Sequence, residues 1–264
     1  MELVGYIAAV LIGVSLGLIG GGGSILTVPV LVYLFGVDPV LATAYSLFIV
    51  GSTALVGVIS KIRNLEVDFK AALTFGIPSV IAVFVTRKYI IPFIPDIIIS
   101  NDHIVLSKGT FLLILFSILM LLAAYSMYFE KTNTDQKSPK PKNLLMAMIE
   151  GALVGVLTGL VGAGGGFLII PALVLLGGLP MKKAIGTSLL IIATKSLIGF
   201  IGDVSNYYMD WKLLISVSIL AIIGIFIGNG LSKLVSGAKL KKGFSVFVII
   251  MGLYIIIKEI FIQN

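Results

Sequence analysis

The sequence predicts an all-α polytopic membrane protein with two inverted repeats, each a glycine-broken re-entrant helical hairpin plus three transmembrane helices. The first supporting observation is composition, because charged residues are 12% of the 264 and hydrophobic residues 58%, with a mean hydropathy of +1.15. A soluble domain has about twice that share of charge, so this much apolar surface needs lipid as its solvent. The other two observations are an internal duplication and an uneven distribution of basic residues.

Ten apolar runs follow one another along the chain, and several approach the ~20 residues that a membrane-spanning helix needs. They cover approximately residues 3–19, 24–35, 41–60, 69–86, 109–129, 144–161, 167–177, 184–202, 211–232 and 243–261. The second and seventh runs are too short to span a bilayer upright, at about 12 residues each. Each directly follows a glycine cluster, at 20–23 and at 162–166. Consecutive glycines cost helix stability, so both clusters predict a broken helix.

One polar segment, from Glu130 to Asn143, divides the chain almost in half and carries Pro139 and Pro141. It predicts a linker at 130–143 between a first membrane repeat at 1–129 and a second, inverted repeat at 144–264. The N-terminus has no basic stretch or small-residue cleavage site before its apolar run. We therefore expect a mature membrane segment there and not a signal peptide.

The two halves are repeats of one another. When the sequence is shifted by 142, residues 11–70 align with 153–212 without a gap, and 24 of the 60 positions are identical. Shared hydrophobicity alone would not align Pro29 with Pro171 and Asn64 with Asn206 at one fixed offset. We therefore expect two copies of one helical unit.

The basic residues decide between parallel and inverted repeats, because they concentrate on the cytoplasmic side of membrane proteins. If each glycine-broken pair were one spanning helix, the repeats would be parallel, with nine Lys and Arg residues on each side. If each pair returns to the side it entered, thirteen lie on the linker side and five opposite, with Lys195 inside a helix. The uneven split favours inverted repeats in the cell membrane, with a cytoplasmic linker and both termini outside.

Several classes of chemistry are excluded by residues that the chain lacks. It has no cysteine and one histidine, His103, which falls in a predicted loop. Disulfides, thiolate metal sites and histidine clusters are thus excluded, and no metal site or cofactor is expected. The sequence also has no P-loop lysine or Gly-rich phosphate fingerprint. The net charge of +7 belongs to the cytoplasmic loops, so it does not indicate nucleic acid.

The glycine breaks are candidate substrate sites. In lipid, unwound backbone is tolerated only where it is buried or lines a polar cavity, and free N–H groups near a half-helix N-terminus suit an anion. The candidate groups are Gly21, Gly22, Gly23, Ser24, Gly164, Gly165 and Gly166. Pro29 and Pro171 are expected in the first turn of each returning half-helix. The alternative is that the glycines only permit close helix packing.

Two ionisable residues fall within the predicted spans. Lys195 lies deep in its run, where a charge is costly and usually faces a cavity or a partner. It could be the counter-charge of an anionic substrate or form a structural ion pair with Glu150. Glu150 could instead carry a coupling proton.

Hydroxyl groups near the start of the helix after each returning segment could also bind oxyanions. The first half offers Thr43, Ser46 and Ser52, and the second offers Thr187, Ser188, Thr194 and Ser196. We take Ser46, Thr187 and Ser188 as candidate substrate ligands. Such hydroxyls more often bond back to carbonyls of their own helix.

At both breaks the sequence resembles the TauE/SafE sulfite exporter family. The resemblance is carried by Gly17–Ser24, Leu26 and Pro29, by Gly159–Gly166, Leu168 and Pro171, and by the segment Ala184–Leu189. It covers essentially the whole chain and implies a permease for small sulfur-containing anions, such as sulfite, taurine or sulfoacetate. The first half departs from the pattern, since Ala44 and Tyr45 stand where the second half has Gly186 and Thr187.

The expected function is therefore secondary transport, as an exporter, of a small sulfur-containing oxyanion, with no enzymatic activity. Its partners would be the substrate and the lipid bilayer, and a homo-oligomer is left open. Alternating access would rock one repeat against the other around a site near the membrane midplane. The alternatives are a permease for another anion or for a metal cation, a membrane-embedded enzyme and an anchored partner subunit.

Overall fold

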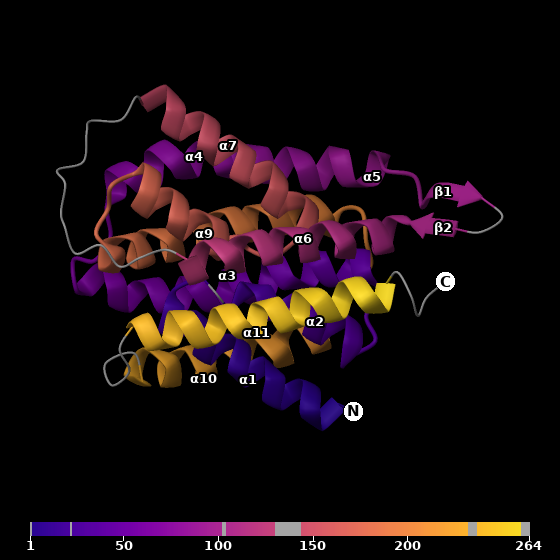
Figure 1. Cartoon of the computed structure of the whole chain (residues 1–264), viewed down its shortest axis with the longest axis horizontal. Coiled ribbons are helices and arrows are strands. Elements are labelled where there is room, and N and C mark those ends of the chain that lie inside the picture. Colours follow the sequence, from indigo (N-terminus) through magenta and orange to yellow (C-terminus); the bar gives the residue numbers. More distant parts are fainter. Residues whose placement is uncertain (1, 22, 102–103, 130–143, 232–236, 260–264) are drawn as a thin grey trace.

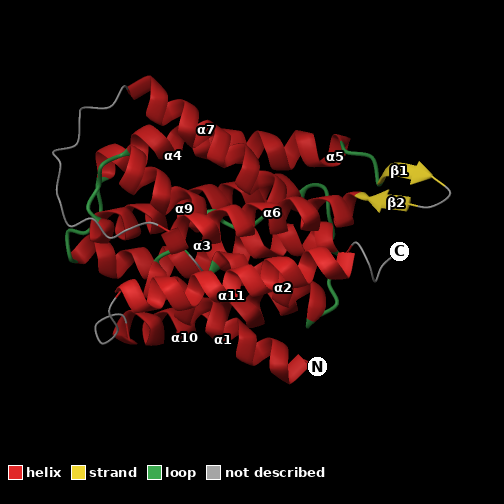
Figure 2. Ribbon diagram, in the orientation of Figure 1, coloured by secondary structure: helices red, strands yellow, loops and turns green. Residues whose placement is uncertain are grey.

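The computed structural model describes the chain except residues 1, 22, 102–103, 130–143, 232–236 and 260–264. Nearly all of the described chain is helical (Figure 2). In the first half the elements are α1 (Glu2–Ile19), α2 (Ser24–Tyr33), α3 (Pro39–Arg63), α4 (Phe69–Val85), the π-helical turn η1 (Thr86–Ile90), α5 (Ile91–Phe93), β1 (Ile97–Asn101), β2 (Ile104–Ser107) and α6 (Lys108–Phe129). The second half has α7 (Leu144–Val161), α8 (Gly166–Pro171), the π-helical turn η2 (Ala172–Leu176), α9 (Met181–Val204), α10 (Trp211–Leu231) and α11 (Gly237–Ile257).

The predicted all-α polytopic membrane fold is confirmed. Within the described ranges, six helices are long and apolar enough to cross a membrane: α3, Phe69–Phe93, Lys108–Tyr125, α7, α9 and α10. The loop expected around residues 96–108 contains the antiparallel hairpin of β1 and β2. His103 lies outside the described residues.

Polar residues fix where the long helices begin. The Asp38 carboxylate accepts hydrogen bonds from the amides of Val40 and Leu41 at the start of α3, and Pro39 occupies the first helical position. The Asp68 carboxylate likewise accepts the amide of Ala71 at the start of α4. Both aspartates satisfy N–H groups that a helix leaves free in its first turn.

Both predicted glycine breaks are present, but they are shorter than expected. α2 begins at Ser24 and α8 at Gly166, so Pro29 and Pro171 lie inside the returning helices. The prediction that these prolines mark the first turn is therefore wrong. After Pro171 the helix widens into η2, which fits the loss of one backbone donor at the proline.

The central helices α3 and α9 pack antiparallel. A Cβ added to Gly186, near the start of α9, would meet Lys61 in the last turn of α3 and Glu66 just after it. Gly51 faces Leu197, and Gly199 near the end of α9 faces Leu47. Positions rise along one helix as they fall along the other. Because α9 is the counterpart of α3 at the offset of 142, the two equivalent helices run in opposite directions.

The outer pairs α1–α10 and α4–α7 pack parallel through glycine. A Cβ added to Gly13 or Gly17 of α1 would overlap backbone atoms of α10. A Cβ added to Gly151 or Gly155 of α7 would overlap the carbonyl groups of Phe75 or Ser79 on α4. Small residues thus let the backbones approach closely, as at helix interfaces in membranes.

A pair of hydrogen bonds repeats between the halves. The amide of Asp68 donates to Thr187 Oγ1 over 2.9 Å, and the amide of Asp210 donates to Tyr45 Oη over 2.6 Å. Asp68 corresponds to Asp210, and Tyr45 to Thr187, at the offset of 142. The first half thus donates to the second half through the same hydrogen bond by which the second half donates to the first.

The first and last described residues lie at the opposite end of the helical bundle from the end of α6 and the start of α7. α1 begins and α11 ends at the end that also carries β1 and β2, called here the terminal end (Figure 1). α6 ends and α7 begins at the other, called here the linker end (Figure 1). The Tyr6 ring near the start of α1 contacts the Phe35 ring just after α2, with centroids 5.3 Å apart. α2 therefore returns to the end from which α1 enters.

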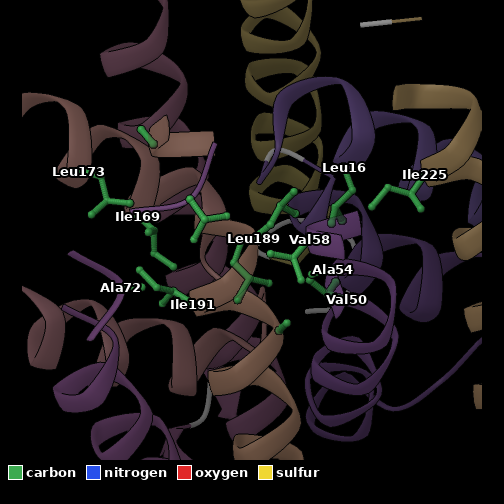
Figure 3. Packing of buried hydrophobic residues seen from close by; sticks show 14 of the residues in the cluster. Leu16, Val50, Ala54, Val58, Ala72, Ile169, Leu173, Leu189, Ile191 and Ile225 are labelled. Carbon is green, nitrogen blue, oxygen red and sulfur yellow. The ribbon is translucent and has the colours of Figure 1, made fainter. Parts of the chain in front are cut away.

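The largest apolar cluster joins the two halves. Leu16, Val50 and Ala54 of the first half pack with Leu189 and Ile225 of the second (Figure 3). Exposed apolar side chains cover the outside of the bundle, including Leu153 at 60% exposure and Ile219 at 53%. Water would penalise such a surface, whereas the interior of a bilayer accepts it.

Candidate functional site

The two glycine breaks meet inside the bundle. A Cβ added to Gly166 would overlap the Cα of Gly21, and one added to Gly21 would lie 2.5 Å from the Cα of Gly166. Both residues are buried. The two breaks are 142 residues apart in the sequence, and the sequence alone did not predict that they touch. A substrate bound between them requires the two backbones to separate.

The remaining break residues surround this contact. Ser24 is buried, and its hydroxyl donates to the carbonyl of Gly21 over 2.8 Å. A Cβ on Gly164 would lie 3.4 Å from the Ser24 Cβ, so Gly164 also faces the first break. Gly23 packs against Ile12 and Leu16 of α1 within its own half. Gly22 lies outside the described residues.

Lys195 is the charged group of this region. Its side chain is fully buried, and its Nζ donates to Thr158 Oγ1 over 2.7 Å. A Cβ added to Gly165 would lie 2.7 Å from that Nζ, so the ammonium group stands at the second break. Gly165 has a φ of +72°, a conformation that favours glycine. The structure therefore brings Lys195 together with Gly165, one of the predicted glycines.

The alternative pairing of Lys195 with Glu150 is not found. The two ion pairs among the described side chains are Lys61–Glu66 and Arg87–Asp203. Glu150 precedes Thr158 by eight residues on α7, which is about 12 Å along the helix axis. Glu150 instead lines a cavity of about 320 Å³ at the linker end, together with Asp68, Lys70 and Thr74.

The hydroxyl candidates divide into three groups. Ser188 donates to Ile185 O, and Thr43, Ser52 and Thr194 likewise donate to carbonyls of their own helices. Thr187 accepts the Asp68 amide and so holds the loop between α3 and α4. Ser46 Oγ and Ser196 Oγ are buried without a hydrogen-bond partner in the described structure. Of the three predicted ligands, Ser188 donates its proton within its own helix, Thr187 acts as an acceptor, and Ser46 has no partner among the described residues.

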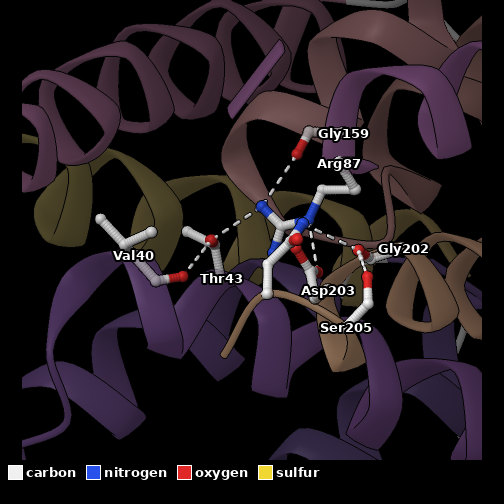
Figure 4. Close-up of polar contacts among 8 residues, drawn as sticks. Val40, Thr43, Arg87, Gly159, Gly202, Asp203 and Ser205 are labelled. Carbon is white, nitrogen blue, oxygen red and sulfur yellow. Dashed lines mark hydrogen bonds and ion pairs between the residues drawn. The ribbon is translucent and has the colours of Figure 1, made fainter. Parts of the chain in front are cut away.

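A second polar cluster, centred on Arg87, joins both halves (Figure 4). It lies near the terminal end, because Arg87 follows α4 and Asp203 is close to the end of α9. Arg87 and Asp203 are fully buried, and Nε donates to Asp203 Oδ2 over 2.7 Å. Arg87 Nη1 donates to Thr43 Oγ1 over 2.9 Å and to Gly159 O over 3.2 Å. Gly159 O is one of the last carbonyls of α7, which a helix leaves without an internal donor.

Sequence reasoning missed this Arg87 cluster. Arg87 and Asp203 directly follow apolar runs that end at about 86 and 202, so both appear to begin loops. In the structure the helical path continues through Arg87 to Phe93, and α9 continues to Val204. The sequence does contain a sign that the helix continues past Arg87, since the apolar residues Tyr89, Ile90 and Ile91 follow it.

No metal centre is found, since the described side chains contain no group of three or more His, Cys, Asp or Glu residues able to hold an ion. Two basic side chains instead lie near the second break. Lys195 binds Thr158 and Arg87 binds Gly159, two adjacent residues in the last turn of α7. Arg87 is paired with Asp203, whereas Lys195 has no acidic partner among the described side chains.

Comparison with known proteins decides the family. The model for the sulfite exporter TauE/SafE family matches residues 6–255. This chain belongs to the TauE/SafE family. As a TauE/SafE protein with six candidate spans, it is a multi-pass membrane transporter.

Several curated relatives of this TauE/SafE chain carry transporter names. A probable membrane transporter protein from Xylella fastidiosa (strain 9a5c) is 31% identical over 93% of this chain and 91% of its own length. The probable membrane transporter protein YdhB from Bacillus subtilis is 28% identical over 93% of this chain and 96% of its own length. A further probable membrane transporter protein, from Methanocaldococcus jannaschii, is 26% identical over 97% of this chain and 94% of its own. No solved structure matches the chain.

Proposed function

We propose that this TauE/SafE transporter exports a small sulfur-containing oxyanion, such as sulfite or an organosulfonate, across the cell membrane. The observation that carries the proposal is the ammonium group of Lys195. It is fully buried beside Gly165 and has a neutral hydroxyl as its hydrogen-bond partner. A cation placed so deeply is costly unless a counter-charge accompanies it. An anionic substrate would supply that charge.

The geometry of the breaks supports an oxyanion as the ligand. The first amides of α2, beginning at Ser24, have no acceptor inside the helix and carry the positive end of its dipole. Gly164 and Gly166 lie without side chains against Ser24 and Gly21 at this helix start. Gly165 lies beside Lys195, and its amide donates to Ala163 O over 2.6 Å. The first amides of α2 and one ammonium group suit the several oxygen atoms of a sulfite or sulfonate.

We infer that transport uses inverted repeats, with the linker end in the cytoplasm and the terminal end outside. Three features support this inference. α3 and α9 run antiparallel, the Asp68 and Asp210 hydrogen bonds recur at one offset, and basic residues favour the linker side. Rocking one half against the other would separate Gly21 from Gly166 and expose Lys195 to each side in turn.

Flux in proteoliposomes tests the proposed substrate class. Radiolabelled sulfite or taurine should accumulate with the wild-type protein, and Lys195→Met should lower this flux by roughly tenfold or more, because a charge-assisted hydrogen bond is worth about 1.5–3 kcal/mol. Lys212→Met is the matched control, since Lys212 is an exposed lysine at the start of α10. Equal flux in the two variants would place the substrate elsewhere.

Competition separates the proposed substrate from its alternatives. Unlabelled sulfite, sulfate, thiosulfate, taurine and sulfoacetate should inhibit flux or raise the unfolding temperature of the purified protein, because a bound ligand stabilises the folded state. Inhibition by divalent cations without inhibition by any of these anions would favour a metal permease.

A further inference from the structure

We propose that the Arg87–Asp203 ion pair locks the terminal end of the transport path closed, and that this end opens when the pair separates. The inference rests on the rocking motion of the two halves proposed above, but it does not depend on the identity of the substrate. It assigns a conformational role to two residues outside the proposed substrate site.

The first step is connectivity. Arg87 lies on η1 and Thr43 on α3, both in the first half, whereas Asp203 lies on α9 and Gly159 on α7, both in the second. One guanidinium group therefore ties two segments of the second half to two of the first. Any rotation that parts the halves at this end must break the bonds from Arg87 to Asp203 and to Gly159.

The second step is position. Arg87 lies beyond the C-terminal end of α4 and Asp203 one residue before the end of α9, so the pair is near the terminal end. Thr43, which accepts a hydrogen bond from Arg87, also contacts Gly162 at the second break. The cluster therefore extends from the ion pair toward the glycine breaks. The pair therefore stands between the terminal end and the glycine breaks.

The third step is asymmetry. At the offset of 142, the counterparts of Arg87 and Asp203 are Asn229 and Lys61, which cannot form an ion pair. Lys61 pairs instead with Glu66 on its own half, and both side chains are partly exposed. At the linker end, the described structure has a cavity of about 320 Å³ lined by Asp68, Lys70 and Glu150. Among the described residues, a buried ion pair across the halves is thus found at the terminal end, and a cavity at the linker end.

The fourth step is reversibility. Arg87 Nη2 and Asp203 Oδ1 are buried without a hydrogen-bond partner in the described part of the chain. Two charged groups that are removed from water and only partly satisfied gain little net stability from their pairing. Hydration on opening would satisfy both groups, which favours a contact that can separate over one that is permanent.

Because the chain has no cysteine, one introduced thiol can report access to the path. Ser46 lies three residues beyond Thr43 on α3 and is buried, so Ser46→Cys places a thiol just behind the pair. A membrane-impermeant maleimide is applied to right-side-out and to inside-out vesicles. Tyr208→Cys, at a fully exposed site after α9, identifies the side that faces the terminal end.

With Asp203→Asn, labelling of Ser46→Cys from the terminal side should rise by roughly tenfold or more, because the open state gains population. Labelling from the linker side should fall or stay unchanged. Glu66→Gln is the matched control, since it removes the ion pair at the opposite end and should not raise labelling from the terminal side. The exchange Arg87→Asp with Asp203→Arg should restore slow labelling.

Three results would overturn the proposal. Unchanged terminal-side labelling in a folded Asp203→Asn protein would show that the pair does not close the path. Equal increases from both sides would assign the pair to general stability. If Asp203→Asn does not fold, Arg87→Lys keeps a positive charge but cannot bond to both Asp203 and Gly159 of the second half as the guanidinium group does, and unchanged labelling there would also contradict the lock. Since no substrate enters this assay, it can succeed even if the sulfite proposal fails.

Discussion

At the scale of single residues, the described structure puts Lys195 in an unusual setting. Its ammonium group shares Thr158 Oγ1, whose own proton is donated to the carbonyl of Val154 over 2.7 Å. The hydroxyl thus completes a chain from the α7 backbone to a buried charge. Such a group positions the ammonium at Gly165 rather than neutralising it.

Thr158→Val should therefore affect both stability and transport. Valine has the same shape but no oxygen, so the ammonium would lose its partner and the free energy of unfolding should fall by about 1–3 kcal/mol. Flux should fall with it. Thr158→Ser keeps the oxygen and is the control; thermal unfolding and flux together check both variants. Equal behaviour of the two would mean that the hydroxyl does not hold Lys195.

At the scale of secondary-structure elements, glycine decides how closely the helices approach. Gly155 lets α7 lie against α4, where a Cβ would lie 2.5 Å from the carbonyl oxygen of Ser79. Backbone cannot move aside as a flexible side chain can. The helix contact therefore depends on the missing Cβ and not on any attractive group.

Gly155→Ala should destabilise the protein by about 1–3 kcal/mol, the usual cost of overpacking. Gly230→Ala on α10 is the matched control, because nothing lies within 4 Å of an added Cβ there. That control should be neutral or slightly stabilising, since alanine is the better helix former. Unfolding temperatures in one detergent compare the pair, and equal values would contradict the packing role of Gly155.

The contact between the breaks gives a second prediction at this scale. A Cβ at Gly166 would overlap backbone at Gly21, so Gly166→Ala should force α2 and α8 apart. Flux should fall more than the unfolding temperature does, because the change acts where the substrate is proposed to bind. Gly36→Ala is the control. It should lower stability because Gly36 has a φ of +69°, which alanine adopts poorly, but the flux per folded molecule should stay unchanged.

At the scale of the whole molecule, the orientation in the membrane can be tested with single cysteines. Tyr208→Cys is at the terminal end and should react with an impermeant maleimide in intact cells, because that end is proposed to lie outside. Ser138→Cys, in the predicted linker, should react only after the membrane is permeabilised. The reverse pattern would invert the proposed topology.

Much of the fold followed from sequence because its causes are local. Hydrophobic length identified the spans, glycine clusters identified the breaks, and one fixed offset identified the duplication. Pro29 and Pro171 led to a wrong prediction of where the returning helices begin. A proline in the second turn of a helix removes one backbone hydrogen bond, and neighbouring structure can compensate for that loss. The predicted apolar runs ended too early at Arg87 and Asp203, because hydropathy counts each charged residue by itself. In the structure the two side chains are buried together as an ion pair, so both helices can continue past them.

The sequence by itself determined that this protein lies in a membrane and that its two halves repeat one unit. Composition and the fixed offset can both be read from the order of residues along the chain. Only the tertiary structure decided which distant groups meet: Gly21 with Gly166, Lys195 with Thr158, and Arg87 with Asp203. These pairs are 145, 37 and 116 residues apart in the chain. Their contact depends on how helices from both halves cross, and helix crossing is set by packing in three dimensions.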